Sequence, residues 1–225
     1  MTTKKLILST LIAGAVFVFS PTAGHAATSF YGNGSYGDFT GSFNYVYTSP
    51  ILATLTIDLK NTTPSYRGGY LTAFVFNNPD DLISHVTLTS SDSNFKVIGG
   101  SSYDNKINGS PYGHFDIGAS TGGGFEGSGN PDKGIGVGDS ASFVFTLEGT
   151  DLNTLSNESF ADTLSGGTGH GEGYKSFVAR FRGMECDKSD KVPARIVTPE
   201  PSTLALFAIA LFAGIILRKK IKFAV

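Results

Sequence analysis

The sequence predicts an all-β protein, an antiparallel β-sandwich of jelly-roll or immunoglobulin-like type with long glycine-rich loops. Short runs rich in β-branched and aromatic residues recur between clusters of Gly, Asn, Asp, Ser and Pro, a pattern typical of strands joined by turns. Glycine is abundant, with 29 of 225 residues, and stretches with a helical period are nearly absent. The lack of a fixed-period repeat disfavours a propeller or a solenoid.

Seven strands are expected from these runs. They cover residues 39–47, 53–59, 70–76, 86–89, 95–98, 141–147 and 177–182. In the second run, Leu55, Ile57 and Leu59 alternate with polar residues, as in a strand with one buried face. In the third run both faces are largely apolar, which predicts a central strand that is covered on both sides.

Two segments depart from the strand pattern. Residues 150–164 predict one short helix, with Asp151 or Asn157 at its N-cap. Residues 99–138 are glycine-rich and irregular, and they predict long surface loops around one weak hairpin.

The N-terminus has the features of a secretory signal peptide. Two lysines precede a mostly apolar stretch at residues 6–19, and a proline then breaks the helix. Small residues occupy the −3 and −1 positions of a cleavage site, which consists of Gly24, Ala26 and the following Ala27. Signal peptidase is therefore expected to remove residues 1–26 during export.

The C-terminus carries an apolar run of 14 residues, 204–217, that predicts one transmembrane helix. Its length as a helix is about 21 Å at about 1.5 Å per residue, against a hydrocarbon core of about 30 Å. Flanking residues lengthen the span on both sides. The run ends at a stop-transfer basic cluster, which predicts a cytoplasmic C-terminus. This cluster consists of Arg218, Lys219, Lys220 and Lys222.

Without these two ends, residues 27–198 form a body large enough for one domain with its own core. Six of the 17 basic and one of the 19 acidic residues lie in the end segments, which leaves 11 basic against 18 acidic residues and a formal charge of −7. An acidic body argues against nucleic acid as a partner. Since Cys186 is the only cysteine, an intramolecular disulfide and a zinc site with several thiolates are excluded.

Candidate motifs for catalysis and cofactor binding are weak. Gly122, Gly124 and Gly127 match the dinucleotide fingerprint G-x-G-x-x-G, but no helix follows them, so they predict no cofactor. The segment 104–109 begins like a calcium loop, but Lys106 occupies a ligand position and no glutamate closes the loop. We expect no bound metal.

Two histidines stand two residues before an acid. On a strand each pair would share one face, as a metal-binding pair or an acid/base couple needs. These pairs are His114 with Asp116 and His170 with Glu172. Aromatic residues in the predicted loops either stack on sugar rings or cover the ends of the sandwich. These residues are Tyr31, Tyr36, Tyr103, Tyr112 and Phe125.

The order of features at the C-terminus resembles the PEP-CTERM sorting signal. The segment Pro199, Glu200, Pro201 and Ser202 precedes the apolar helix and the basic cluster, and the likeness covers residues 199–225. The resemblance implies a bacterial exported protein that exosortase, a membrane-embedded protease, cleaves near this step. It also implies an association with extracellular polysaccharide and biofilm formation. The bodies of such proteins vary, so no active site is carried over.

The sequence therefore predicts a structural or adhesive protein without catalysis, which passes through an inner-membrane intermediate to the cell surface or the extracellular matrix. The expected partners are signal peptidase, exosortase, the membrane through the C-terminal helix, and extracellular polysaccharide. No cofactor is expected. Two alternatives remain open: a permanently membrane-anchored surface protein, and a glycan-binding or glycan-active exported protein.

Overall fold

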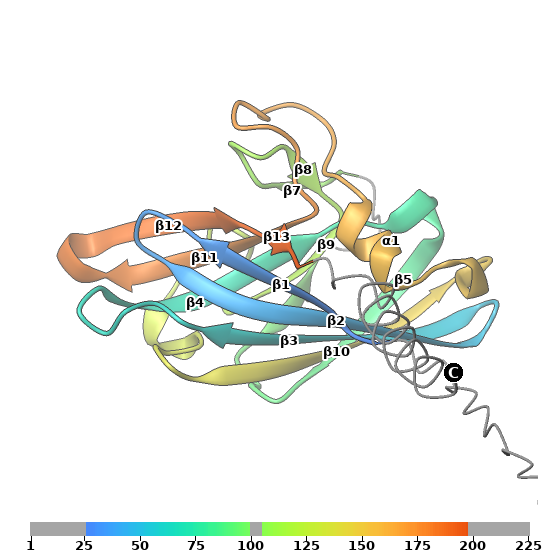
Figure 1. Ribbon diagram of the computed structural model, residues 1–225, viewed down its shortest axis with the longest axis horizontal. Coiled ribbons are helices and arrows are strands. Elements are labelled where there is room, and N and C mark those ends of the chain that lie inside the picture. The colour runs from blue at the N-terminus through green and yellow to red at the C-terminus, as the bar shows by residue number, and fades with distance from the viewer. Residues whose placement is uncertain (1–25, 100–104, 198–225) are drawn as a thin grey trace, which may run out of the picture.

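The computed structural model describes residues 26–99 and 105–197, which fold into two antiparallel sheets packed face to face (Figure 1). The predicted antiparallel β-sandwich is confirmed. Six strands form the first sheet, called sheet A. In spatial order they are β13 (Arg195–Ile196), β1 (Thr28–Asn33), β2 (Asp38–Ser49), β3 (Leu52–Asn61), β10 (Ser140–Gly149) and β5 (Ile83–Ser90).

Five strands form the second sheet, called sheet B. Their order is β12 (Lys188–Pro193), β11 (Phe177–Met184), β4 (Gly68–Phe76), β9 (Ile117–Ser120) and β6 (Lys96–Ile98). A separate hairpin consists of β7 (Ile107–Asn108) and β8 (His114–Phe115). The helical elements in the described part of the chain are α1 (Asn157–Asp162) and the 3-10 turns η1 (Pro79–Asp81), η2 (Pro131–Lys133), η3 (Leu152–Thr154) and η4 (Glu185–Asp187).

All seven expected strands are present, as β2, β3, β4, β5, β6, β10 and β11. Leu55, Ile57 and Leu59 of β3 point into the core, as their alternation with polar residues predicts. Every residue from Leu71 to Phe76 of β4 is buried, because this strand lies between β11 and β9 with its outer face covered as well. Its prediction as a central strand is confirmed.

The expectation of loops throughout residues 99–138 is wrong at one place. The weak hairpin exists as β7 and β8, but Ile117–Ser120 form β9, a buried strand between β4 and β6. A Cβ atom on Gly118 would lie 2.3 Å from the carbonyl oxygen of Phe74, so the close approach of β4 requires a residue without a side chain. The small residues that hide this strand in the sequence are therefore the ones that its position requires.

The expected short helix is α1, but its N-cap is Ser156 and not Asn157. Asp151 instead precedes the 3-10 turn η3. The Asn157 side chain accepts a hydrogen bond from the Tyr45 N–H at 2.6 Å, which ties the start of the helix to β2. The helix closes one end of the sandwich because Phe160 packs against Phe43, Tyr45 and Phe76.

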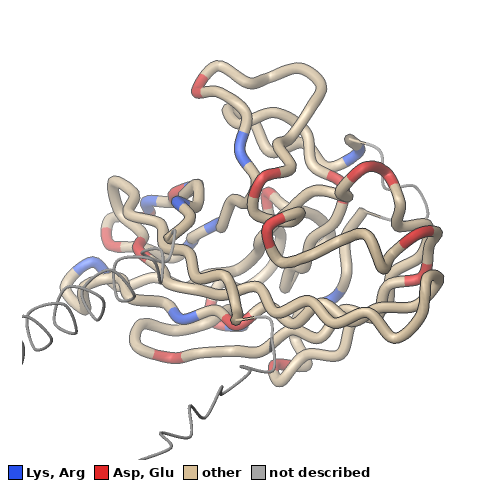
Figure 2. The backbone as a smooth tube through the Cα atoms, turned by 45° about the vertical axis from the view of Figure 1, so that its right-hand side comes forward, with Lys and Arg blue, Asp and Glu red and all other residues tan. Residues whose placement is uncertain are grey.

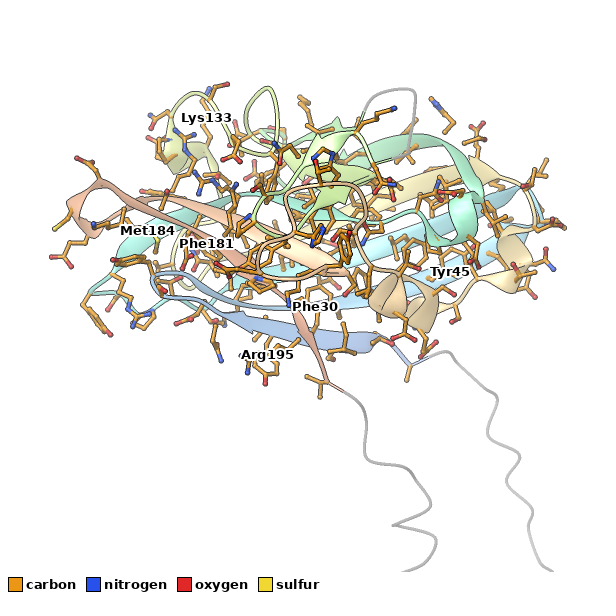
Figure 3. All side chains as sticks on the ribbon, turned by 90° about the horizontal axis from the view of Figure 1, so that it is seen from above. Phe30, Tyr45, Lys133, Phe181, Met184 and Arg195 are labelled. Atoms are coloured by element: carbon orange, nitrogen blue, oxygen red, sulfur yellow. The ribbon has the colours of Figure 1, made fainter. Side chains whose placement is uncertain are left out.

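Phenylalanine rings from both sheets fill the core. The ring centroid of Phe177 in sheet B lies close to three ring centroids of sheet A. The distances are 4.8 Å to Phe30, 5.8 Å to Phe39 and 6.0 Å to Phe43. Phe177 also stacks on Phe74 of its own sheet at 5.6 Å. Figure 3 shows how the core follows the long axis, with Phe181 toward one end, Phe30 near the middle and Tyr45 toward the other end.

We predict that Phe177→Ala lowers the free energy of unfolding by about 3–5 kcal/mol, because it removes the ring that contacts both sheets and leaves a cavity. Urea unfolding monitored by circular dichroism measures the change. The control is Val46→Thr, which keeps a β-branched side chain at a site that is 56% exposed and should change stability by less than about 0.5 kcal/mol. A loss below about 1 kcal/mol for Phe177→Ala would contradict this role.

Candidate functional site

The chain leaves the body along the edge of sheet A where β1 and β13 pair. Phe30 lies opposite Ile196, and Tyr31 lies opposite Arg195. The Val197 N–H donates to the carbonyl oxygen of Ser29 at 2.8 Å. The segment that leads to Pro199 is therefore bound to the start of the first strand.

Two residues of the expected signal-peptidase site belong to the described chain. Ala26 and Ala27 are both exposed, and β1 begins immediately afterwards at Thr28. The carbonyl oxygen of Ala26 accepts a hydrogen bond from the Asn157 side-chain amide at 2.9 Å. The remaining residues of the predicted processing and anchoring sites lie outside the described chain: Gly24, Pro199, Glu200, Pro201, Ser202, Arg218, Lys219, Lys220 and Lys222.

The expected transmembrane helix at residues 204–217 also lies outside the described residues. Within residues 26–99 and 105–197, no helix has the length and apolar character that a membrane span needs.

The outer face of sheet A is rich in hydroxyl groups, because Ser and Thr are the most frequent residues among those that alternate with the buried ones on its strands. They are Ser29, Thr40, Ser42, Thr54, Thr56, Thr87, Thr89, Ser140, Ser142 and Thr146. A groove of about 560 Å³ crosses this face and is lined by Tyr31, Asp58 and Lys60 among others. Tyr31, one of the aromatics considered for sugar stacking, is half-buried here.

The outer face of sheet B is covered by loops, in contrast to sheet A. Ala73, Val75 and Val178 project from this sheet into a second apolar cluster under the β7–β8 hairpin and the glycine-rich loop. Tyr112 and Phe125 belong to this cluster and are buried. Both residues therefore cover the sandwich, and neither ring is free to stack on a sugar.

Charged groups join the covering loops to sheet B. The Glu126 carboxylate forms ion pairs with Lys191 and, at 3.7 Å, with the Arg180 guanidinium. Burial lowers the pKa of Arg180, whereas the charge of Glu126 raises it. The Tyr112 hydroxyl donates to the Glu172 carboxylate at 3.1 Å, which ties the loop at residues 164–176 to the hairpin.

The turns after β1, β3 and β11 meet at one end of the sandwich, on the left of Figure 1. They enclose a pocket of about 350 Å³, here called the tyrosine pocket, lined by Tyr36, Tyr66, Arg67, Glu185 and Lys188 among others. The Tyr66 ring is 71% exposed and the Tyr36 ring 38% exposed. Arg67 lies over the Tyr66 ring at 5.6 Å, and Lys188 lies over the Tyr36 ring at 6.0 Å.

Hydrogen bonds between the turns hold the tyrosine pocket in place. The Asp190 carboxylate accepts from the N–H groups of Tyr36, at 2.8 Å, and of Gly37, at 3.2 Å. Arg67 forms an ion pair with Asp38 at 3.6 Å, and its carbonyl oxygen accepts from the Glu185 N–H at 2.9 Å. Tyr36 is one of the loop aromatics that the sequence suggests for sugar stacking. Tyr66 is not among them, because the sequence of a single turn does not show which rings from other turns share its pocket.

The two histidine–acid pairs have structural contacts. Asp116 is buried, and its carboxylate accepts from the N–H groups of Asn78, at 2.8 Å, and Asn105. The His114 ring contacts the carbonyl oxygen of Asn105 at 3.2 Å. In the second pair, the His170 ring lies against Tyr174 at 4.4 Å, while Glu172 accepts from Tyr112.

The glycine and calcium motifs lie in loops. Gly122, Gly124 and Gly127 follow β9 in a turn where the Gly127 N–H donates to the Gly124 carbonyl oxygen at 3.1 Å. Asp104 and Tyr103 lie outside the described residues. Among residues 26–99 and 105–197, no three His, Cys, Asp or Glu side chains are grouped closely enough to hold a metal ion. Figure 2 shows the acidic residues spread over several loops and not gathered in one patch.

The body is an antiparallel β-sandwich, and its last strand, β13, leads directly into a C-terminal sorting motif. Residues 197–220 match the family model described as the PEP-CTERM protein-sorting motif, which confirms the resemblance inferred from the sequence. The motif implies a protein that is exported and sorted by exosortase. No curated protein matches the chain.

Among solved structures, the chain is similar to a biomass-sensing module of an Rsgi-like protein from Clostridium thermocellum. That module is described as resembling a family 3 carbohydrate-binding module of the cellulosome. The two chains are 14% identical, with a TM-score of 0.33, and the alignment covers 69% of this chain and 91% of the module. At this TM-score the likeness carries no information about a ligand.

Two buried tyrosines predict a pH dependence of stability. Burial raises the pKa of Tyr45 to about 12, and burial together with the Glu172 carboxylate raises that of Tyr112 to about 12. Because the folded protein favours the neutral phenol, this stabilisation is complete below pH about 10 and is lost as the pH rises through about 12. An absorbance titration should show two phenols that ionise late, around pH 12, and Tyr45→Phe and Tyr112→Phe should each remove one of these late steps from the total absorbance change.

The matched control for this titration is Tyr66→Phe, at the exposed rim of the tyrosine pocket, and it should leave both late steps in place. If neither core variant changes the late part of the titration curve, the assignment to Tyr45 and Tyr112 is wrong.

Proposed function

We propose that the protein is a non-enzymatic, exported β-sandwich that exosortase sorts to the cell surface or the extracellular matrix, where it is a structural or adhesive component. The observation that carries this proposal is the PEP-CTERM motif at residues 197–220, directly after the last strand of the body. Signal peptidase would cut before Ala27, and exosortase near Pro199. Until the second cut, the apolar helix would hold the body at the inner membrane.

The boundaries of the sandwich support two cuts. β1 begins at Thr28 and β13 ends at Ile196, so cleavage after Ala26 and near Pro199 would leave every strand intact. Among the described residues, the buried core cluster runs from Phe30 to Val192, which both cuts would leave in the mature body. The N-terminal cut falls beside the exposed residues Ala26 and Ala27, and the C-terminal cut falls after the last strand of the body.

The surroundings of the charged residues support a role without catalysis. Asp116, Asp190 and Glu126 each bind backbone N–H groups or cations that join loops to the sheets. Such contacts rigidify a scaffold. The extracellular polysaccharide partner and the biofilm role rest on the sorting motif alone and are part of the proposal.

The experiment that tests this proposal is the intact mass and location of the mature protein in a producing bacterium, with and without its exosortase. We expect an N-terminus at Ala27, loss of the segment after the Pro199–Pro201 step, and release from the inner membrane. Without exosortase, the protein should stay in the membrane fraction with residues 202–225 retained. Retention of these residues when the enzyme is present would instead support a permanently anchored surface protein.

A deletion of residues 218–225 provides a second test. The deletion removes the stop-transfer cations, which favour a cytoplasmic C-terminus. Without them the helix should no longer hold this orientation in the membrane, and exosortase should no longer process the chain. The cations are Arg218, Lys219, Lys220 and Lys222. The control for the deletion is Lys106→Ala, which removes one cation from an exposed loop of the body. Unchanged processing after the deletion would show that the basic cluster has no role.

A further inference from the structure

The tyrosine pocket exposes aromatic surface that the fold does not use. Tyr66 is 71% exposed and Tyr36 is 38% exposed, whereas Tyr112 and Phe125 are buried under the loops of sheet B. A tyrosine ring has an electron-rich face, and it presents a large, rigid contact area at low entropic cost. The apolar side of a sugar ring is a plane of C–H groups with partial positive charge, which is complementary to such a face.

The charges around the pocket indicate an uncharged ligand. The charged side chains that line the pocket are Arg67, Lys188 and Glu185, and Arg67 is paired with Asp38 just outside the lining. With Asp38 included, the four charges cancel. The body at residues 27–198 has 11 basic and 18 acidic residues, so its net charge is negative. A polyanionic ligand would therefore be repelled as it approaches. The same charged side chains supply hydrogen-bond donors and acceptors for hydroxyl groups.

The pocket is pre-organised. Its turns are joined by the contacts of Asp190 with Tyr36 and Gly37 and by the contacts of Arg67 with Asp38 and Glu185. Arg67 lies over the Tyr66 ring, and Lys188 lies over the Tyr36 ring. A site whose side chains are held before binding loses less entropy when the ligand arrives. Its volume of about 350 Å³ is large enough for one or two sugar rings.

The pocket lies away from the place where the chain leaves the body. Val197 is bound to Ser29 at the start of β1, and Ser35 and Tyr36 follow the end of the same strand. The six residues of β1 separate the two places by about 20 Å, at about 3.3 Å per residue. The pocket is therefore separate from the place where the chain leaves the body toward the sorting motif.

We propose that the tyrosine pocket binds a neutral polysaccharide chain, with sugar rings stacked on Tyr36 and Tyr66 and with Arg67, Lys188 and Glu185 bound to their hydroxyl groups. This proposal rests on the proposed function, because it makes the pocket the adhesive contact of a surface or matrix protein. It assigns binding and no bond cleavage to the site.

The test uses the full-length chain, purified in detergent and applied to an array of neutral hexasaccharides of glucose, mannose, galactose and xylose, with polygalacturonate as the anionic probe. Binding is then quantified by calorimetry on the neutral probe with the highest signal. We expect Tyr36→Ala and Tyr66→Ala each to weaken binding about three- to tenfold. Tyr66→Phe should retain most of the affinity, because it keeps the ring face.

The matched control is Tyr47→Ala, which removes a 52% exposed ring near the turn between β2 and β3, at the other end of the sandwich. It should bind like the unchanged protein. Tyr31→Ala tests the groove on sheet A, and a loss of affinity in this variant with none in Tyr36→Ala and Tyr66→Ala would overturn the assignment. Binding of polygalacturonate alone, or of no neutral probe, would overturn the proposal as well.

Failure of this proposal is distinguishable from failure of the proposed function. The binding assay uses purified chain and does not depend on processing, whereas the mass of the mature protein does not depend on Tyr36 or Tyr66. Normal processing of Tyr66→Ala together with lost binding would support both proposals.

Discussion

Contact between phenylalanine rings of the two sheets is the interaction on which the rest of the structure depends. Phe177 of sheet B meets Phe30, Phe39 and Phe43 of sheet A, and it stacks on Phe74 within its own sheet. Neither sheet can bury its apolar face without the other. This packing also decides which face of each strand points outward, and therefore which side chains are available to a partner.

Among residues 26–99 and 105–197, long loops fold over the outer face of sheet B and leave that of sheet A uncovered. Those loops bury Tyr112 and Phe125 and place Glu126 between Lys191 and Arg180, so the face is closed by packing and by charge. The outer face of sheet A keeps its hydroxyl groups open to solvent. Access for a large ligand is consequently greatest at the face of sheet A and at the turns that form the tyrosine pocket.

Strand β1 runs between the start of the segment that leads into the sorting motif and the tyrosine pocket. Its start pairs with the segment that leads into the sorting motif, and its end enters the turn that carries Tyr36. In the proposed function, processing occurs at one end of this strand and adhesion at the other. Since a strand is stiff and its hydrogen bonds are shared with β2, the distance between the two ends is fixed by the sheet.

The sequence by itself determined the strands with a clear alternation, such as β3, the covered strand β4, and the sorting motif, because each is encoded in a continuous segment. It did not reveal β9, whose Gly118 and Ala119 carry no strand pattern and fit only because β4 passes so close. Tyr36, Tyr112 and Phe125 looked equivalent in the sequence. Only the tertiary structure decided which rings are buried and joined Tyr36 to Tyr66, because exposure depends on contacts between segments that are far apart in the chain.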